Sequence, residues 1–220
     1  IGVLCRAMSR PTDDLYLRAV RVLLYLHHTR HLGLRYQASE FTLKGYSDSD
    51  WATRHSTTGW CFVYSQAVVS WSSRKQASVA LSSCEAEIMA LSEAAKEGIY
   101  LRRFLDELGL GDAYATAVAC DNSAARNLAY NPEHHERTKH IERRHFYIRE
   151  LVEAGELVVP LVSTVDNISD FFTKCVPPAT FWRMRNVIMN VPSDDRRVRS
   201  PGGCSSEHGG VSESGPHGIG

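Results

Sequence analysis

The chain has 220 residues, of which 43% are hydrophobic, so it is long enough and apolar enough for one domain with a buried core. Its 25 Lys and Arg residues balance its 25 Asp and Glu residues, so overall charge points to no particular class of partner. No apolar run approaches the roughly 18 residues of a membrane-spanning helix, and the first residues lack the apolar core of a signal peptide. These features argue against a membrane protein. The six cysteines are scattered with no CxxC pair, which predicts reduced thiols in an intracellular protein.

The first 40 residues predict one helix. Thr12 precedes the apolar run LYLRAVRVLLYLHH and is a suitable N-cap, and Gly33 is a suitable end. Residues 41–47 then predict a strand that delivers Asp48 at its end. Residues 57–65 and 67–75 are rich in β-branched and aromatic side chains, so they predict two further strands of an antiparallel meander.

The remaining elements alternate between helix and strand. Residues 80–109 have helical periodicity, with Ser82 and Glu85 spaced as a capping box and Gly109 at the end. Short apolar strands are predicted at 115–122 and 156–164, with an amphipathic helix at 134–155 between them. A last helical stretch runs from 166 to about 189. Gly, Ser and charged residues dominate from 191 to 220, which predicts a disordered tail.

This order of elements predicts an α/β fold with a mixed five-stranded sheet, flanked by helices. Four acidic residues fall near strand ends or helix starts, where α/β sheets place their sites: Asp48, Glu87, Asp121 and Asp170. Converging carboxylates repel one another, and Mg²⁺, which prefers oxygen ligands, would offset that repulsion. Position alone leaves a second interpretation open, because acids also occupy such termini for solubility and capping.

Several stretches resemble the ribonuclease H domain of copia-type retrotransposon polyproteins. They are GYSDSDWA, SWSSRKQASVALSSCEAEIMALSEAAKE, CDNSAA, HERTKHIERRHFYIRE and ISDFFTK, and they occur in the family's order between residues 1 and 189. The resemblance implies a ribonuclease H-like domain at 41–190, preceded at 1–40 by the end of the reverse transcriptase connection segment. It leaves 191–220 as the tail.

The resemblance also implies the chemistry. Carried over by motif, the catalytic and metal-binding acids are Asp48, Glu87, Asp121 and Asp170, holding two Mg²⁺ or Mn²⁺ ions and no small-molecule cofactor. Asp50 is then a neighbour that caps the turn or adjusts the local charge. Basic and polar residues at two places are expected to contact nucleic acid: Arg74, Lys75, Gln76, Arg137, Lys139 and Arg143. A solvated helix face is the alternative for the second group.

Two departures from related sequences are visible. Cys175 stands where the family usually has a proline, which affects packing rather than chemistry. The loop before Asp170 lacks the histidine that cellular ribonucleases H carry there. The polymerase motif YxDD is absent from the chain, so DNA synthesis is not expected of it.

The resemblance predicts a metal-dependent endonuclease that hydrolyses the RNA strand of an RNA/DNA hybrid, alongside the reverse transcriptase domain of the same polyprotein. The expected location is the cytoplasm, a virus-like particle or the nucleus. The alternative is a catalytically silent relic that binds nucleic acid or the polymerase. A third, weaker hypothesis is a DNA-cutting relative with the same fold.

Overall fold

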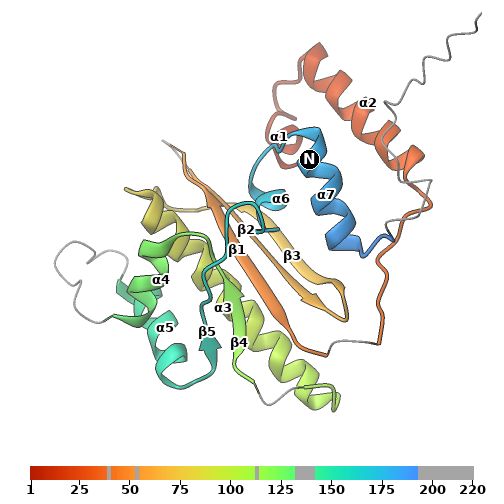
Figure 1. The fold of residues 1–220 in the computed structure, drawn as a ribbon. Helices are drawn as coiled ribbons and strands as arrows, with labels where there is room; N and C mark the ends of the chain where they lie inside the picture. The colour runs from red at the N-terminus through yellow and green to blue at the C-terminus, as the bar shows by residue number, and fades with distance from the viewer. Residues whose placement is uncertain (39–40, 53–54, 112–113, 132–141, 193–220) are drawn as a thin grey trace, which may run out of the picture.

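The computed structural model describes residues 1–38, 41–52, 55–111, 114–131 and 142–192 (Figure 1). Within these ranges the strands are β1 (Lys44–Asp50), β2 (Thr57–Tyr64), β3 (Ala67–Lys75), β4 (Thr116–Ala119) and β5 (Leu157–Val158). The helices are α1 (Gly2–Arg6), α2 (Asp13–His28), α3 (Ser83–Glu107), α4 (Ser123–Tyr130), α5 (Glu142–Glu153), α6 (Asp170–Thr173) and α7 (Pro178–Met189).

The strands form one mixed sheet in the order β3-β2-β1-β4-β5. Strands β1, β2 and β3 are antiparallel neighbours, whereas β4 pairs parallel with β1 and β5 pairs parallel with β4. The predicted mixed five-stranded sheet, with its meander of three strands, is confirmed. The parallel pairing matters for function, because it brings the carboxyl ends of β1 and β4 to the same edge of the sheet.

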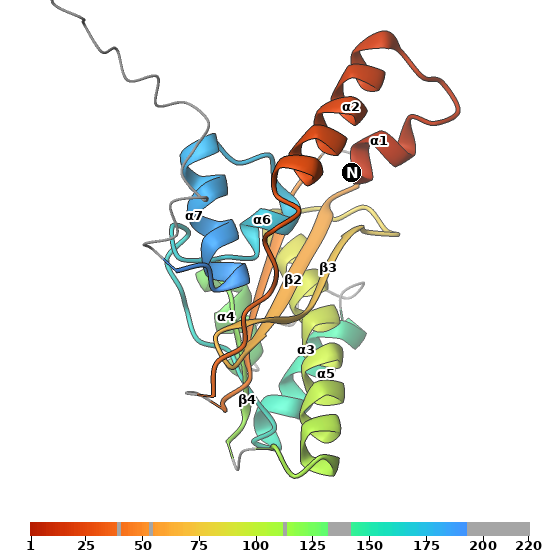
Figure 2. The ribbon, with the colours of Figure 1, turned by 90° about the vertical axis from the view of Figure 1, so that its right-hand side faces the viewer.

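The alternating side chains of β2 divide the core between the two faces of the sheet. Trp60, Phe62 and Tyr64 join the cluster that packs under α3. Cys61 joins the opposite cluster with residues of α7, such as Met184. Figure 2 shows the result as layers, with α3 and α5 on one side of the strands and α6 and α7 on the other.

Helix α3 packs closely on the sheet because it carries a glycine at the contact. A Cβ at Gly98 would lie 3.0 Å from both the Phe62 ring and the Thr116 methyl group. Ser82 caps the helix, since its hydroxyl accepts a 3.1 Å hydrogen bond from the Glu85 backbone N–H, as predicted. The other half of the predicted capping box differs, because the Glu85 carboxylate accepts from the backbone N–H of Leu81.

The β2–β3 hairpin turns at the predicted break. Ser65 and Gln66 both have positive φ, 51° and 71°. Positive φ at both central residues is the pattern of the two-residue type I′ turn, whose twist matches that of the flanking strands. The turn sets the pairing of Tyr64 with Ala67, and a register shift between Phe62 and Val63 then brings Thr58 of β2 opposite Arg74 of β3.

Some predicted boundaries were wrong. Strand β1 begins at Lys44 and continues through Asp50, so Asp48 lies inside the strand rather than after it. Helix α2 ends at His28, with Thr29 as its C-cap, and not at Gly33. The predicted last helix is two helices, because Pro177 and Pro178 interrupt it, and Pro178 instead starts α7.

Two other elements differ from the prediction. Helix α4 was not predicted; Asn122 starts it by accepting a hydrogen bond from the Ala125 backbone N–H. The regular part of β5 has two residues, and a single bridge pairs Cys120 with Leu161 beyond it. Pro160 lies between these two parts and has no N–H to donate to a ladder.

The N-terminal helices lie at one end of the molecule (Figure 1). Helix α2 has no buried residue and touches α7 through Tyr25, whose ring lies 5.7 Å from that of Phe181. The predicted domain boundaries at residues 40 and 190 stay predictions, and the predicted tail lies outside the described residues from position 193 on. Among the helices described, none combines the length and apolar character needed to cross a membrane.

Candidate active site

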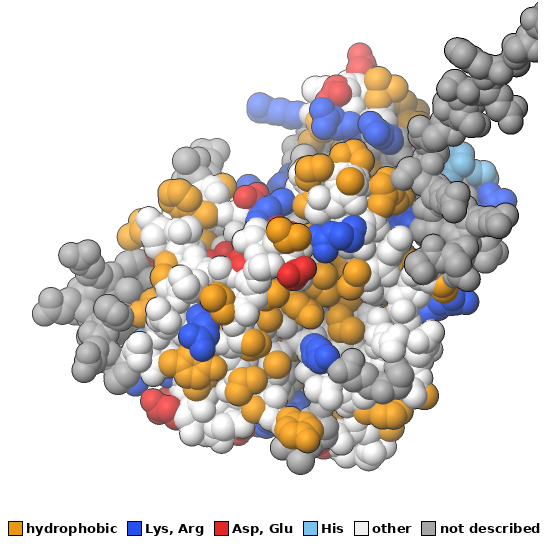
Figure 3. Space-filling view, viewed as in Figure 1, with side chains coloured by type: hydrophobic (Ala, Val, Ile, Leu, Met, Phe, Trp, Pro, Cys, Tyr) orange, Lys and Arg blue, Asp and Glu red, His pale blue; other side chains and the backbone are white. Residues whose placement is uncertain are grey.

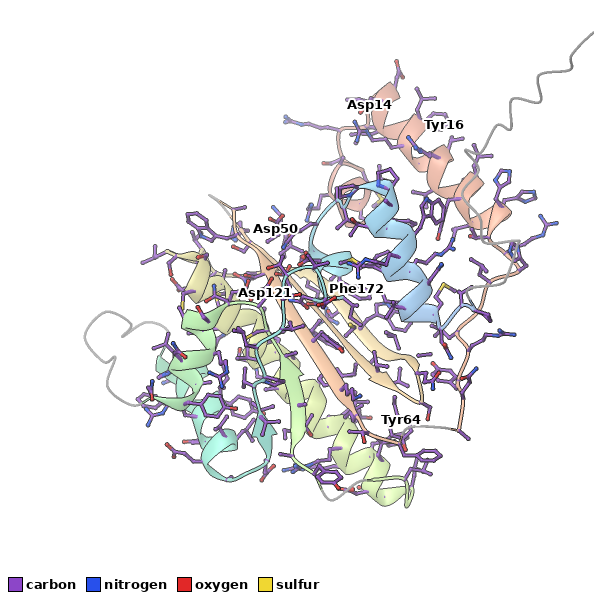
Figure 4. All side chains as sticks on the ribbon, viewed as in Figure 1. Asp14, Tyr16, Asp50, Tyr64, Asp121 and Phe172 are labelled. Carbon is purple, nitrogen blue, oxygen red and sulfur yellow. The ribbon has the colours of Figure 1, made fainter. Side chains whose placement is uncertain are left out.

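The register of the sheet places two aspartates side by side. Strands β1 and β4 run parallel, and Tyr46 pairs with Ala119 at the end of their ladder. Two residues farther along each chain are Asp48 and Asp121, so the continued register sets them opposite each other. Figure 4 labels Asp121 at this end of β4 and Asp50 farther along β1. Asp50 is exposed and is not part of the cluster described below.

Helix α3 brings a third carboxylate from the face of the sheet. Glu87 is the fifth residue of α3, so it lies in the second turn, close to the helix start at which the sequence placed it. Its Oε1 accepts hydrogen bonds from the backbone N–H and the hydroxyl of Ser49, at 3.1 and 2.9 Å. Ser49 is the β1 residue next to Asp48, so these bonds tie the glutamate directly to the strand that carries the first aspartate.

The three acids form a compact cluster. Each of Asp48, Glu87 and Asp121 offers one carboxylate oxygen, and these oxygens all lie within 4.8 Å of one another. Burial raises the pKa of Glu87 to about 8, and the negative charge of Asp48 adds to the effect. Burial likewise raises the pKa of Asp48 to about 6. The site therefore holds its charges at a free-energy disadvantage when no cation is bound.

Asp170 reaches the cluster from the opposite face of the sheet. It is the first residue of α6, is 7% exposed and is not one of the three converging acids. Lys174, one turn later, lies between it and the cluster: its ammonium is 2.8 Å from Asp170 Oδ1 and 3.5 Å from Asp48 Oδ2. The fourth predicted acid is thus linked to the other three through a lysine.

Helix α6 is held against β1 by close contacts. The Thr173 hydroxyl donates to Asp48 Oδ2. The buried Asn167 side chain donates to the backbone oxygen of Ser47, at 3.1 Å. Gly59 of β2, which pairs with Asp48, leaves the space for α6, since a Cβ there would lie 2.5 Å from a Thr173 methyl carbon.

The residues present fit a divalent metal ion. Glu87 Oε2 is buried and has no hydrogen-bond partner among the residues described. A lone buried carboxylate oxygen beside two further carboxylates is the donor set of a hard cation such as Mg²⁺ or Mn²⁺. Cys120 lies near the cluster, and burial raises the pKa of its thiol to about 11.

The predicted nucleic-acid contacts lie in different settings. Arg74 and Lys75 are exposed at the end of β3, and Arg143 is exposed on α5. Gln76 is only 7% exposed, and its amide donates to Thr58 Oγ1 and to the backbone oxygen of Ala86. Two further predicted contacts lie outside the described residues: Arg137 and Lys139. All of these contacts stay predictions.

Sequence reasoning assigned no role to four residues that shape this site. They are Ser49, Asn167, Thr173 and Lys174. Thr173 and Lys174 belong to the ISDFFTK stretch, so the motif contained the signal. Asn167 had none, because its role depends on a strand more than a hundred residues away in the sequence.

Comparison with known proteins identifies the family. No family model matches the chain. It is 40% identical over 192 residues, 86% of its length, to the "Retrovirus-related Pol polyprotein from transposon TNT 1-94" of Nicotiana tabacum. It is 36% identical over 186 residues, 82% of its length, to the corresponding polyprotein from transposon RE2 of Arabidopsis thaliana. The chain belongs to the Pol polyproteins of copia-type transposons.

The chain spans a small part of these Pol polyproteins, 14% and 13% of their respective lengths. Among solved structures, the RNase H1 of the archaeon Halobacterium salinarum NRC-1 is similar with a TM-score of 0.44 and 13% identity. That alignment covers 60% of this chain and 94% of the archaeal one. The strand order β3-β2-β1-β4-β5 matches the ribonuclease H-like fold.

Proposed function

We propose that this Pol segment is a metal-dependent ribonuclease H that hydrolyses the RNA strand of an RNA/DNA hybrid. The observation that carries the proposal is the convergence of Asp48, Glu87 and Asp121, with Glu87 Oε2 buried and unpaired among the residues described. The sequence resemblance and the Pol family membership point to the same activity. The reverse transcriptase domain of the same polyprotein is the proposed partner.

The acidic residues would hold two Mg²⁺ or Mn²⁺ ions. Such an ion pair activates a water molecule for attack on a phosphodiester and stabilises the leaving oxygen. Asp48, Glu87 and Asp121 would supply the converging ligands, and Asp170 a fourth carboxylate from α6. Ser49 holds the Glu87 carboxylate through two hydrogen bonds to Oε1, which would leave Oε2 free to bind an ion.

Lys174 has a defined task in this arrangement. Partial burial would lower the pKa of its ammonium, but the hydrogen bond to Asp170 and the charge of Asp48 outweigh this and raise it. The lysine is therefore charged at neutral pH and offsets the repulsion between these two aspartates. It keeps these two carboxylates close together while no metal ion is bound.

The hybrid would be selected by shape and by its 2′-hydroxyl groups rather than by base sequence. Arg74, Lys75 and Arg143 are proposed to contact phosphates, which position a duplex without reading its sequence. Trp51 directly follows β1 and is 50% exposed, with its indole N–H donating to the Ala80 backbone oxygen. This bond sets the orientation of an aromatic ring at the rim of the site.

A substrate panel tests the proposal. One RNA sequence is labelled and presented to the protein in Mg²⁺ as an RNA/DNA hybrid, as a single strand and as an RNA duplex, with the matching DNA duplex alongside. We expect cutting of the RNA strand of the hybrid alone, leaving 3′-hydroxyl and 5′-phosphate ends. Ligation of the products to an acceptor with a 3′-hydroxyl detects the 5′-phosphate.

Two other outcomes of the substrate panel would support the alternative hypotheses, a DNA nuclease or a silent relic. Cutting of the DNA duplex instead of the hybrid would indicate a DNA nuclease built on the same fold. Hybrid binding without cutting, in Mg²⁺ and in Mn²⁺, would indicate a silent relic that retains only the binding surface. Either result would overturn the proposed activity.

A further inference from the structure

Gln76 lies where strand β3 ends, close to both β2 and α3. It directly follows Lys75, the last residue of β3, and it is buried. Its backbone N–H donates a 2.8 Å hydrogen bond to the backbone oxygen of Ser56, the residue before β2. The backbone of Gln76 is therefore fixed beside the start of β2.

The side-chain amide of Gln76 joins β2 to α3. Its Nε2 donates to Thr58 Oγ1 at 3.0 Å and to the backbone oxygen of Ala86 at 2.9 Å. A carbonyl oxygen can only accept a hydrogen bond, so the Ala86 contact determines which end of the amide is the nitrogen. Thr58 and Ala86 are both buried, so these two bonds are shielded from water.

The contacts of Gln76 close a ring around Glu87. Ala86 directly precedes Glu87 in α3. Thr58, the other partner of the amide, pairs across the sheet with Ser49. Ser49 in turn donates two hydrogen bonds to Glu87 Oε1. Glu87 is thus held twice, at its carboxylate by Ser49 and at the adjoining backbone by Gln76.

The oxygen of the same amide is closed off from solvent. Gln76 Oε1 is buried and has no hydrogen-bond partner among the residues described. A buried acceptor without a partner lowers stability, and an apolar side chain of similar size would avoid that loss. The two bonds made by Nε2 are therefore the interactions that distinguish a glutamine from an apolar residue here. The neighbouring Lys75, by contrast, is exposed to solvent.

We infer that Gln76 is a positioning residue, which holds the first turns of α3 against β2 and so sets where Glu87 places its carboxylate. Its role would then lie inside the protein and not in a contact with nucleic acid. The inference rests on the proposed function, in which Glu87 is a metal ligand.

Calorimetric titration with Mg²⁺ tests the effect on the metal site. Gln76→Met keeps a side chain of similar size and removes both hydrogen bonds of the amide. We expect the variant to bind Mg²⁺ about tenfold more weakly than the unchanged protein, as is typical when a residue that orients a metal ligand is lost.

Amide hydrogen exchange in EDTA tests the same link without a metal ion. The Ser49 N–H donates to Glu87 Oε1, so a displaced glutamate would leave it unprotected. In Gln76→Met this N–H should exchange about fivefold faster than in the unchanged protein, as the loss of one hydrogen bond would give. Equal values for the variant and the unchanged protein, in exchange or in Mg²⁺ affinity, would overturn the inference.

Hybrid binding distinguishes a positioning residue from a contact. Fluorescence anisotropy in EDTA measures the affinity for an RNA/DNA hybrid without cleavage. Gln76→Met should leave this affinity unchanged, whereas Lys75→Met, which removes an exposed neighbouring charge, should lower it. A loss in Gln76→Met as large as that in Lys75→Met would show a contact with nucleic acid and overturn the inference.

Two control variants separate position from stability. Gln37→Met makes the same change at an exposed glutamine and should alter none of these measurements. Ile188→Val removes a methyl group from the core under α7, on the opposite side of the sheet from α3 (Figure 2). It should lower the melting temperature without weakening Mg²⁺ binding. If it weakened Mg²⁺ binding as much as Gln76→Met, loss of stability alone would explain the effect and the inference would fail.

The results also separate this inference from the proposed function. If Mg²⁺ binds equally well to Gln76→Met and to the unchanged protein, only the role of Gln76 is overturned. If the unchanged protein binds no Mg²⁺, the proposed metal site is overturned instead, and the exchange of the Ser49 N–H still decides whether Gln76 positions Glu87.

Discussion

At the level of single residues, the site is a set of carboxylates that the fold buries close together. Burial makes their ionised forms unfavourable while no cation is bound. An unfolded carboxyl group has a pKa of about 4. Burial raises the pKa of Glu87 to about 8 and that of Asp48 to about 6. Between about pH 4 and pH 8 the metal-free folded protein thus binds more protons than the unfolded chain, so its stability falls as pH rises.

This difference predicts a pH-dependent effect of magnesium. Thermal melts in EDTA should show a lower melting temperature at pH 8 than at pH 5. Added Mg²⁺ should raise the melting temperature at pH 8, where the carboxylates are ionised, and have little effect at pH 5, where protons compete with the metal. Glu87→Gln should reduce both the pH dependence and the Mg²⁺ effect. A Mg²⁺ effect of the same size at both pH values would contradict this account.

Lys174 predicts a second measurable effect at this scale. Its ammonium neutralises Asp48 and Asp170, so it competes with a divalent cation for the same carboxylates. Lys174→Met should raise the affinity for Mg²⁺ by about tenfold, because a nearby like charge is removed. Calorimetric titration with Mg²⁺ measures this change directly.

The controls for Lys174 separate its charge from its packing. Lys174→Arg retains the charge and should bind Mg²⁺ as the unchanged protein does. Lys96→Met removes a positive charge from α3 at a distance from the cluster and should also leave the affinity unchanged. Equal affinities for Lys174→Met and the unchanged protein would show that the lysine does not compete with the metal.

The sequence allowed the four acids to be proposed, because each belongs to a recognisable stretch. It did not reveal that Asp48, Glu87 and Asp121 converge while Asp170 joins through Lys174, since that depends on side-chain directions across two helices and a sheet. Residue type and spacing carry no information on such directions.

At the scale of elements, the site depends on how closely α6 approaches β2. Gly59 permits this approach, and Thr173 of α6 then donates to Asp48. Gly59→Ala places a methyl group against Thr173 and the neighbouring backbone, which should reduce stability by about 1–3 kcal/mol. Mg²⁺ affinity should fall as well, because α6 carries Asp170.

Chemical denaturation and Mg²⁺ titration check this prediction. Gly33→Ala is the matched control, because a Cβ at Gly33 meets no atom within 4 Å. If Gly59→Ala were as stable as Gly33→Ala and bound Mg²⁺ normally, the close contact between β2 and α6 would not position the site.

Elements with local signals were predicted well, and the others were not. The caps of α2 and α3 and the turn at Ser65–Gln66 follow from side chains within a few residues. Helix α4 is short, so its periodicity is weak, and the split of the last helix at Pro177 was overlooked although proline is a strong signal. Strands β1 and β4 lie about seventy residues apart in the sequence, so no local pattern predicts that they pair.

At the scale of the whole molecule, the N-terminal helices stand apart from the sheet. Figure 3 shows apolar side chains among Lys and Arg over this end. Leu17 and Leu23 of α2 are 64% and 65% exposed. Exposed apolar surface of this kind is typical of an interaction site, which agrees with a proposed contact to another part of the polyprotein.

Because apolar side chains of α2 are exposed, substitutions there should have little effect on the stability of the protein. Leu17→Lys with Leu23→Lys should change the free energy of unfolding by no more than about 0.5 kcal/mol for each residue. Chemical denaturation measures this effect. Leu91→Ala is the buried counterpart and should cost about 2–5 kcal/mol, because Leu91 is 0% exposed in the core. A large loss of stability in the α2 variant would mean that this helix is packed against the domain.

We propose above that the carboxylate cluster is a working metal site. The most direct test is the rate of RNA cleavage in a hybrid as a function of Mg²⁺ concentration, for the unchanged protein and for Asp48→Asn, with EDTA as a blank. We expect a rate that rises and saturates with Mg²⁺ in the unchanged protein, and no cutting by the variant at any concentration. Equal cutting by Asp48→Asn, or cutting that persists in EDTA, would contradict it.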